Sequence, residues 1–159
     1  DVYKRHGKKI TNASHWGHIN FTKANITFDG DVISKGNFIV DMTSISVDDI
    51  SGGGKNRLEN HLKDDDFFSV DKFKNAELEI LEKSEMIDNK YLVEANLTIK
   101  GITNPITFEM TQLTDDSYKA KLIFDRSKYD VQYRSGSFFE NLGDRLILDD
   151  VELEVTLVK

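Results

Sequence analysis

Hydrophobic and polar residues alternate with a period of two along most of the chain. The clearest run has apolar residues at every second position, namely Tyr91, Val93, Ala95, Leu97 and Ile99. Residues 38–42, 106–110, 118–124 and 151–157 repeat the same alternation. A period of two indicates β-strands that have one face in a core and the other toward water.

Residues 17–28 also alternate, but the phase slips within the segment. Ile19 and Phe21 occupy one parity, whereas Ile26 and Phe28 occupy the other. A β-bulge adds one residue to a strand and so reconciles two opposite phases. The sequence therefore predicts a bulge near Thr22 and Lys23.

Turn-forming residues separate the alternating runs. They are Asp29-Gly30, Asp88-Asn89, Gly101 with Asn104-Pro105, Asp115-Asp116 and Ser135-Gly136. The short spacing between runs is typical of antiparallel hairpins rather than of parallel crossovers. We therefore expect an all-β protein, a sandwich or barrel of about eight antiparallel strands.

One region interrupts the alternation. We expect residues 51–54 to form a flexible glycine-rich loop and residues 55–62 a short helix, because Leu58, His61 and Leu62 have helical spacing. An acidic turn follows, and Phe67 and Phe68 then return to the core. The chain contains no internal repeat and no linker, so residues 1–159 are expected to form a single domain.

Composition narrows the classes of function. The chain carries 28 acidic residues against 21 basic ones, a net charge of -7, which disfavours binding to nucleic acid. It has no cysteine, which excludes disulfides, thiol nucleophiles and cysteine-ligated metals. Its longest apolar runs are three residues, such as Phe38-Ile39-Val40, so no membrane insertion is expected.

Five segments together resemble a known family. They are residues 14–19 (SHWGHI), 36–45 (GNFIVDMTSI), 58–68 (LENHLKDDDFF), 97–103 (LTIKGIT) and 125–133 (DRSKYDVQY). In this order they are similar to motifs of the YceI-like family, bacterial lipocalin-like barrels often described as polyisoprenoid-binding. Residues 5–9 stand where that family has a Trp-x-Gly-x-Lys pattern and lack its tryptophan. The resemblance therefore leaves the first strand shortened or missing.

The resemblance implies a lipocalin-like antiparallel β-barrel around an apolar interior, with one short helix across part of it. It also implies binding of an isoprenoid quinone, polyprenyl or fatty-acyl molecule, and export to the periplasm or the outside. Removal of a signal peptide would agree with a chain that begins at Asp1 rather than at a methionine.

Large apolar side chains supply candidates for a cavity lining. They are Phe38, Val40, Met42, Phe67, Phe68, Phe73, Ile99, Phe108, Tyr118, Leu122, Phe124, Phe138 and Phe139. The residue pattern alone favours a dry, filled core, because most alternating aromatic residues simply pack together. The resemblance instead favours a lined cavity, for which a barrel of about eight strands is just wide enough.

Three polar residues are candidates for the rim of that barrel or for contact with a ligand headgroup. His15 and His18 form an H-x-x-H pair, but residues three apart on a strand point to opposite faces. We therefore expect no metal there. Arg126 follows Asp125, and a structural ion pair between them is favoured over an anionic headgroup site.

No catalytic motif is present. The Asp64–Asp66 run lacks the spacing of a calcium loop, and the glycines at 52–54 lack the context of a phosphate-binding loop. We expect a non-catalytic carrier of one apolar ligand with no required cofactor. Two alternatives stay open: a filled-barrel stress or interaction protein, and a metal-dependent enzyme that uses His15 and His18. For partners, we expect one small apolar ligand, with a homodimer as a further option.

Overall fold

The computed structural model describes residues 2–7, 14–142 and 146–159. The strands are β1 (Val2–Gly7), β2 (Ser14–Asp29), β3 (Val32–Val47), β4 (Asn75–Ile80), β5 (Met86–Ile87), β6 (Lys90–Ile99), β7 (Ile102–Thr114), β8 (Ser117–Asp125) and β9 (Asp150–Val158). The helices are α1 (Gly52–Lys63) and the short 3₁₀ helix η1 (Arg126–Tyr129). In these described ranges no helix is long and apolar enough to cross a membrane.

All strands belong to one antiparallel sheet in the order β4-β3-β2-β1-β9-β8-β7-β6-β5. The sheet curls so that β4 also pairs with β6, through partners such as Leu78 and Leu97. This pairing closes a ring of eight strands within the described part of the chain, with the two-residue β5 beside β6. The prediction of an antiparallel barrel of about eight strands is confirmed.

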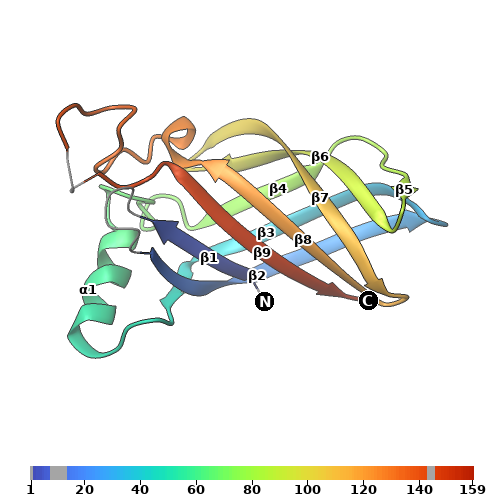
Figure 1. Ribbon diagram of the computed structural model, residues 1–159, viewed down its shortest axis with the longest axis horizontal. Helices are drawn as coiled ribbons and strands as arrows, with labels where there is room; N and C mark the ends of the chain where they lie inside the picture. Colours follow the sequence, from blue (N-terminus) through green and yellow to red (C-terminus); the bar gives the residue numbers. More distant parts are fainter. Residues whose placement is uncertain (1, 8–13, 143–145) are drawn as a thin grey trace.

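The barrel has two distinct ends (Figure 1). At the α1 end lie α1, the segment between α1 and β4, and the long connection between β8 and β9. At the hairpin end lie the turns that join β2 to β3, β5 to β6, and β7 to β8. Asp88 and Asn89 at this end both adopt left-handed backbone conformations, with φ of 52° and 62°, which tight hairpin turns require.

Alternation predicts the inward faces of the strands well. On β6, Tyr91, Val93, Ala95, Leu97 and Ile99 are all buried, with at most 6% of their surface exposed. On β8, Tyr118, Ala120, Leu122 and Phe124 are buried in the same way. The strands predicted from a period of two are therefore present with the predicted faces in the core.

The register of β2 and β3 shifts between Phe21 and Lys23, which confirms the predicted bulge. The two strands also approach each other closely at Gly17. A Cβ atom at this position would lie 1.9 Å from the carbonyl oxygen of Ser46. Only glycine fits there, which gives a physical reason for the His-x-Gly pattern at residues 15–17.

Two expectations need correction. A missing first strand is wrong, because the six-residue β1 pairs with both β2 and β9 and fills the gap between two otherwise open edges. The glycine-rich segment is not a loop, since α1 begins at Gly52. Packing of its second half holds the helix on the barrel: Leu62 is buried, Leu58 is partly buried, and Glu59 accepts a hydrogen bond from the Val47 amide at 2.9 Å.

Candidate functional site

A narrow apolar cavity of about 80 Å³ lies in the middle of the barrel. Of the described residues, those that line it are Phe21, Ile26, Phe38, Val40, Ala76, Glu77, Leu78, Ile80, Leu97, Phe108, Met110, Ala120, Leu122, Leu153, Val155 and Leu157. They come from seven strands, because alternate residues of every strand face inward. Glu77 is the one charged residue in this set, and its exposed side chain accepts a hydrogen bond from Asn37 at 2.7 Å.

Side-chain size controls the width of the cavity. Gly36 makes room for Ile80, since a Cβ at Gly36 would lie 2.7 Å from the Ile80 Cδ1 atom. The rings of Phe21 and Phe38 fill part of the interior, with centroids 5.8 Å apart. Pockets for drug-sized ligands measure roughly 300–1,000 Å³. A long apolar chain would therefore have to displace some of these side chains.

The predicted lining residues divide into four groups. Phe38, Val40, Phe108 and Leu122 border the cavity. Six others are buried in the core but do not border the cavity, namely Met42, Phe67, Phe68, Ile99, Tyr118 and Phe124. The aromatic ring of Phe73 is only partly buried and lies near Gly101 at the α1 end.

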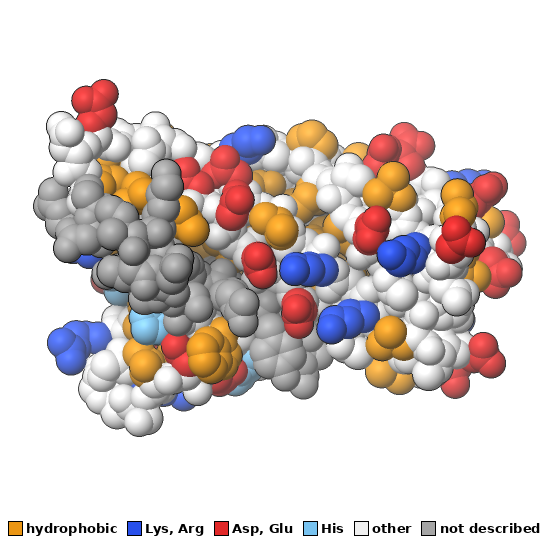
Figure 2. Space-filling view, in the orientation of Figure 1, with side chains coloured by type: hydrophobic (Ala, Val, Ile, Leu, Met, Phe, Trp, Pro, Cys, Tyr) orange, Lys and Arg blue, Asp and Glu red, His pale blue; other side chains and the backbone are white. Residues whose placement is uncertain are grey.

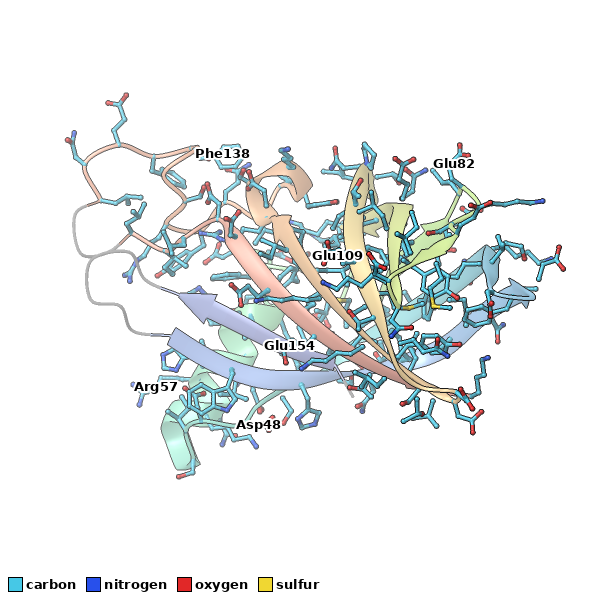
Figure 3. All side chains as sticks on the ribbon, turned by 45° about the vertical axis from the view of Figure 1, so that its right-hand side comes forward. Asp48, Arg57, Glu82, Glu109, Phe138 and Glu154 are labelled. Atoms are coloured by element: carbon cyan, nitrogen blue, oxygen red, sulfur yellow. The ribbon has the colours of Figure 1, made fainter. Side chains whose placement is uncertain are left out.

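Phe138 and Phe139 lie outside the cavity, contrary to the expectation, with 45% and 48% of their surfaces exposed. Both amides donate to the Ser135 carbonyl in a turn of the connection between β8 and β9. Phe138 lies on the outer side of this connection (Figure 3). The period-two argument does not apply to them, because neither residue belongs to a strand.

Several lining residues were missing from the sequence-based set, among them Phe21, Ile26, Leu153 and Val155. Their signal was present, because each lies on the inward parity of an alternating segment. The residues predicted from the sequence were mostly aromatic and included none from β9. In the structure, aliphatic residues of β9 provide one wall of the cavity.

The α1 end of the cavity is packed several layers deep. Phe124 contacts Tyr129 edge to face at 5.8 Å, and Val131 and Val151 are completely buried. Phe67 and Phe68 are also buried in this region. The packing of these described residues resembles the interior of an ordinary protein.

The buried Arg126 side chain connects several backbone segments at the α1 end. Its side chain is fully buried and donates to the carbonyl oxygens of Val131 (2.7 Å), Tyr133 (2.9 Å), Ile147 (3.1 Å) and Leu148 (3.2 Å). Burial lowers the pKa of the guanidinium, an effect that nearby carboxylates partly oppose. Arg126 therefore does not lie at a rim, and the protein's own backbone uses the donors that a headgroup would need.

The expected ion pair between Arg126 and Asp125 takes a different form. Asp125 caps η1, because its Oδ1 accepts a hydrogen bond from the Ser127 amide at 2.9 Å. The carboxylate paired with Arg126 is Asp149, at 3.8 Å. The structural interpretation of Arg126 holds, but with Asp149 and backbone carbonyls as partners.

His15 and His18 lie at the α1 end, beside a small apolar pocket of about 40 Å³ between β2, β3 and α1. The Nδ1 atom of His15 is 2.8 Å from Asp49, and that of His18 is 2.9 Å from Asp48. Each histidine thus has its own carboxylate partner. Among the residues that the structure describes, no group of three or more His, Asp or Glu side chains is placed to hold a metal ion.

The hairpin end is closed differently, by three aromatic rings. Phe28 stacks on Tyr118 with centroids 5.2 Å apart, and Tyr91 lies 6.2 Å from Phe28 and 6.4 Å from Tyr118. The Tyr91 hydroxyl donates to the Asp31 carbonyl at 2.7 Å. Burial raises the pKa of Tyr91, and Tyr118 and Asp31 add to the effect. We call Phe28, Tyr91 and Tyr118 the aromatic cluster.

Comparison with known proteins identifies the fold. A family model described as the YceI-like domain matches residues 3–159. No curated protein matches the chain. Among solved structures, BcnA from Burkholderia cenocepacia has a TM-score of 0.75 and 19% identity, over 99% of this chain and 94% of that one.

Two further structures share the fold. The YCEI protein of Campylobacter jejuni has a TM-score of 0.66 and 20% identity, over 89% of this chain and 83% of that one. A polyisoprenoid binding domain from Saccharophagus degradans, implicated in plant cell wall breakdown, has a TM-score of 0.64 and 13% identity. The match covers 98% of this chain and 90% of that domain.

Proposed function

Because the chain belongs to the family of YceI-like domain proteins, we propose that it binds one long apolar molecule inside the barrel, without catalysis. The apolar lining of the central cavity carries this proposal. A shared fold with a polyisoprenoid binding domain supports an isoprenoid or fatty-acyl chain as the ligand class. The periplasm or the cell exterior is the proposed location, as the family resemblance implies.

Burial of the chain would supply the affinity. Each methylene group moved from water into an apolar interior gains about 0.8 kcal/mol. The cavity of about 80 Å³ is smaller than such a chain, so the lining must rearrange on binding. Met110 suits this role, because its unbranched and flexible side chain adapts to irregular space.

A cavity-filling variant tests the proposal. Ala120 lines the cavity, whereas Lys121 is the next residue on β8 and is exposed on the outer face. We expect Ala120→Leu to weaken binding of hexadecanoate and geranylgeraniol by about tenfold, because the added carbons occupy the space of the ligand. Lys121→Leu, the matched control, should bind both as the wild type does.

Native mass spectrometry with organic extraction gives an independent measurement. Protein purified from its own host should carry a stoichiometric lipid, and the same spectra report whether it is a monomer or a homodimer. Equal binding by Ala120→Leu and the wild type would contradict the cavity as the site. Lipid-free preparations together with no binding of either probe at micromolar concentration would contradict the carrier function itself.

The small cavity favours one second candidate, a filled barrel that acts in stress or protein interactions without a lipid. Under that alternative, Ala120→Leu would raise stability by filling unused space, and no probe would bind. Thermal unfolding in the presence and absence of the probes separates the two functions, because a ligand that binds only the folded state raises Tm.

A further inference from the structure

The two ends of the cavity differ in how thick their closures are. Toward the α1 end, the lining continues into Phe124 and Val151, then into Tyr129, Val131 and the buried Arg126. Toward the hairpin end, the aromatic cluster forms the next inward layer on three strands, beside the buried Ile33 of β3. Each ring lies beside a residue that lines the cavity. Phe28 is two residues after Ile26 on β2, and Tyr118 is two residues before Ala120 on β8. Tyr91 on β6 pairs with Met110 on β7.

The aromatic cluster is also the less tightly packed closure. Phe28 is only partly buried, although Tyr91 and Tyr118 are almost completely buried. Phe28 is thus the one ring of the cluster that is partly exposed, whereas Phe124, Val131 and Val151 at the α1 end are all buried. The hairpin end therefore offers the shorter path for an apolar chain.

A cation stands over this closure. The Nζ atom of Lys159 lies 4.7 Å from the centre of the Phe28 ring and 5.5 Å from that of Tyr118. Its amide donates to the Asp116 carbonyl at 2.7 Å, which fixes the backbone beside the turn between β7 and β8. The pKa of Lys159 is raised, mainly by a hydrogen bond with the Tyr118 side chain, so the exposed ammonium is charged at neutral pH.

We propose that the ligand is a single-chain amphiphile with an anionic head, which enters through the aromatic cluster and rests its carboxylate or phosphate on Lys159 and Tyr118. This inference rests on the proposed function and adds the class of head and the direction of binding. The chain would extend from the cluster into the central cavity, and the head would remain at the surface. Arg126 is excluded as the head's partner, because its donors already bond to backbone carbonyls.

On the face in view, several acidic side chains lie at the same end of the barrel, with basic ones among them (Figure 2). Asp116 lies close enough to affect Lys159, and Asp31 to affect Tyr91. Their field would repel a free inorganic anion, so the apolar chain must bring the head to the site. Lys159 then provides selectivity for a charged head, while burial of the chain provides most of the affinity.

Matched pairs of probes test this inference by titration calorimetry. Hexadecanoate is compared with hexadecanol, and geranylgeranyl phosphate with geranylgeraniol, so that the two sources of anionic head are distinguished. We expect the wild type to bind the charged member of at least one pair about tenfold more tightly. Lys159→Gln should remove that preference and leave binding of the alcohols unchanged.

Lys119→Gln is the matched control, because Lys119 is exposed on the outer face of β8 next to Tyr118. It changes the net charge by the same amount and should keep the preference. Equal affinities for acid and alcohol in both pairs, or a preference that survives in Lys159→Gln, would overturn the inference while leaving the carrier function intact. Failure of all four probes to bind would instead overturn the proposed function and the inference with it.

Fluorescence quenching tests the direction of binding. In Phe28→Trp, 2-bromohexadecanoate carries its bromine near the head and should quench the new indole strongly. Trp16 lies at the α1 end and should be quenched little in the wild type. The opposite result, strong quenching of Trp16 only, would mean that the head lies at the α1 end.

Discussion

The guanidinium of Arg126 donates a hydrogen bond of 2.7 Å to the carbonyl oxygen of Val131, and neither residue is exposed to water. The same side chain reaches the carbonyls of Ile147 and Leu148, 21 and 22 residues further along the chain. One arginine therefore joins both ends of the connection between β8 and β9 and holds it over the α1 end of the barrel.

Loss of this arginine should be costly. Arg126→Met removes the donors and leaves buried carbonyls unsatisfied, which we expect to lower the free energy of unfolding by about 3–5 kcal/mol. Arg57 is exposed on α1 (Figure 3), so Arg57→Met should change the free energy of unfolding by less than about 0.5 kcal/mol. Urea denaturation measures the free energy of unfolding of both variants. Equal stability of the two would contradict the role of Arg126 in holding the connection between β8 and β9.

Gly17 should not tolerate a side chain. A Cβ there would lie 1.9 Å from the Ser46 carbonyl oxygen, so Gly17→Ala must push β2 and β3 apart, at a cost of about 3 kcal/mol or more. Gly53 offers a control within α1, because no atom lies within 4 Å of its Cβ position. Gly53→Ala should stabilise the protein by about 0.5–1 kcal/mol. Thermal unfolding distinguishes these opposite signs.

Glu59 should hold α1 on the barrel. Its Oε1 atom accepts a hydrogen bond of 2.9 Å from the Val47 amide, and Glu59→Ala leaves that amide without this acceptor. We expect a loss of about 1–2 kcal/mol and faster hydrogen exchange of the α1 amides. The neighbouring Asn60 is exposed, and Asn60→Ala should leave exchange in α1 unchanged. Unaltered exchange in Glu59→Ala would show that packing of Leu58 and Leu62 alone retains the helix.

Asp65 links stability to acid pH. A hydrogen bond of 2.7 Å from the Ser69 hydroxyl lowers the pKa of Asp65 below 3.8, and Lys72 contributes in the same direction. Because the folded-state pKa is the lower one, this contribution is present at neutral pH and is lost as the pH falls through that pKa. Ser69→Ala should raise the pKa of Asp65 toward 3.8 in a carboxyl NMR titration, whereas Ser137→Ala should not.

The sequence predicted those parts of the fold that depend on local periodicity. Residues 91–99 and 118–124 have the faces that their alternation indicates, and the slip in residues 17–28 corresponds to a real bulge. Phe138 and Phe139 had no such constraint, because a turn outside the strands positions them. The buried position of Arg126 was harder still to predict, since its partners are backbone carbonyls that only the folded chain brings together.

The cavity shows the same division between local and distant information. Which residues of β9 face inward follows from a period of two, but the volume left between them depends on contacts such as that of Phe21 with Phe38. These two residues are on different strands, and their ring orientation is a property of packing. The aromatic cluster likewise combines residues 28, 91 and 118, which no short motif connects.

The pairing of β1 with β9 has a consequence for biosynthesis. Residues 2–5 find their partners at residues 152–155, so the ring closes only after nearly all of the described chain has been made. Until then β1 and β8 each have an open edge that could pair with another chain. Contacts so distant in sequence slow folding. A nascent copy would therefore be exposed to aggregation for longer than a helical protein of equal size, and would gain most from a chaperone that shields strand edges.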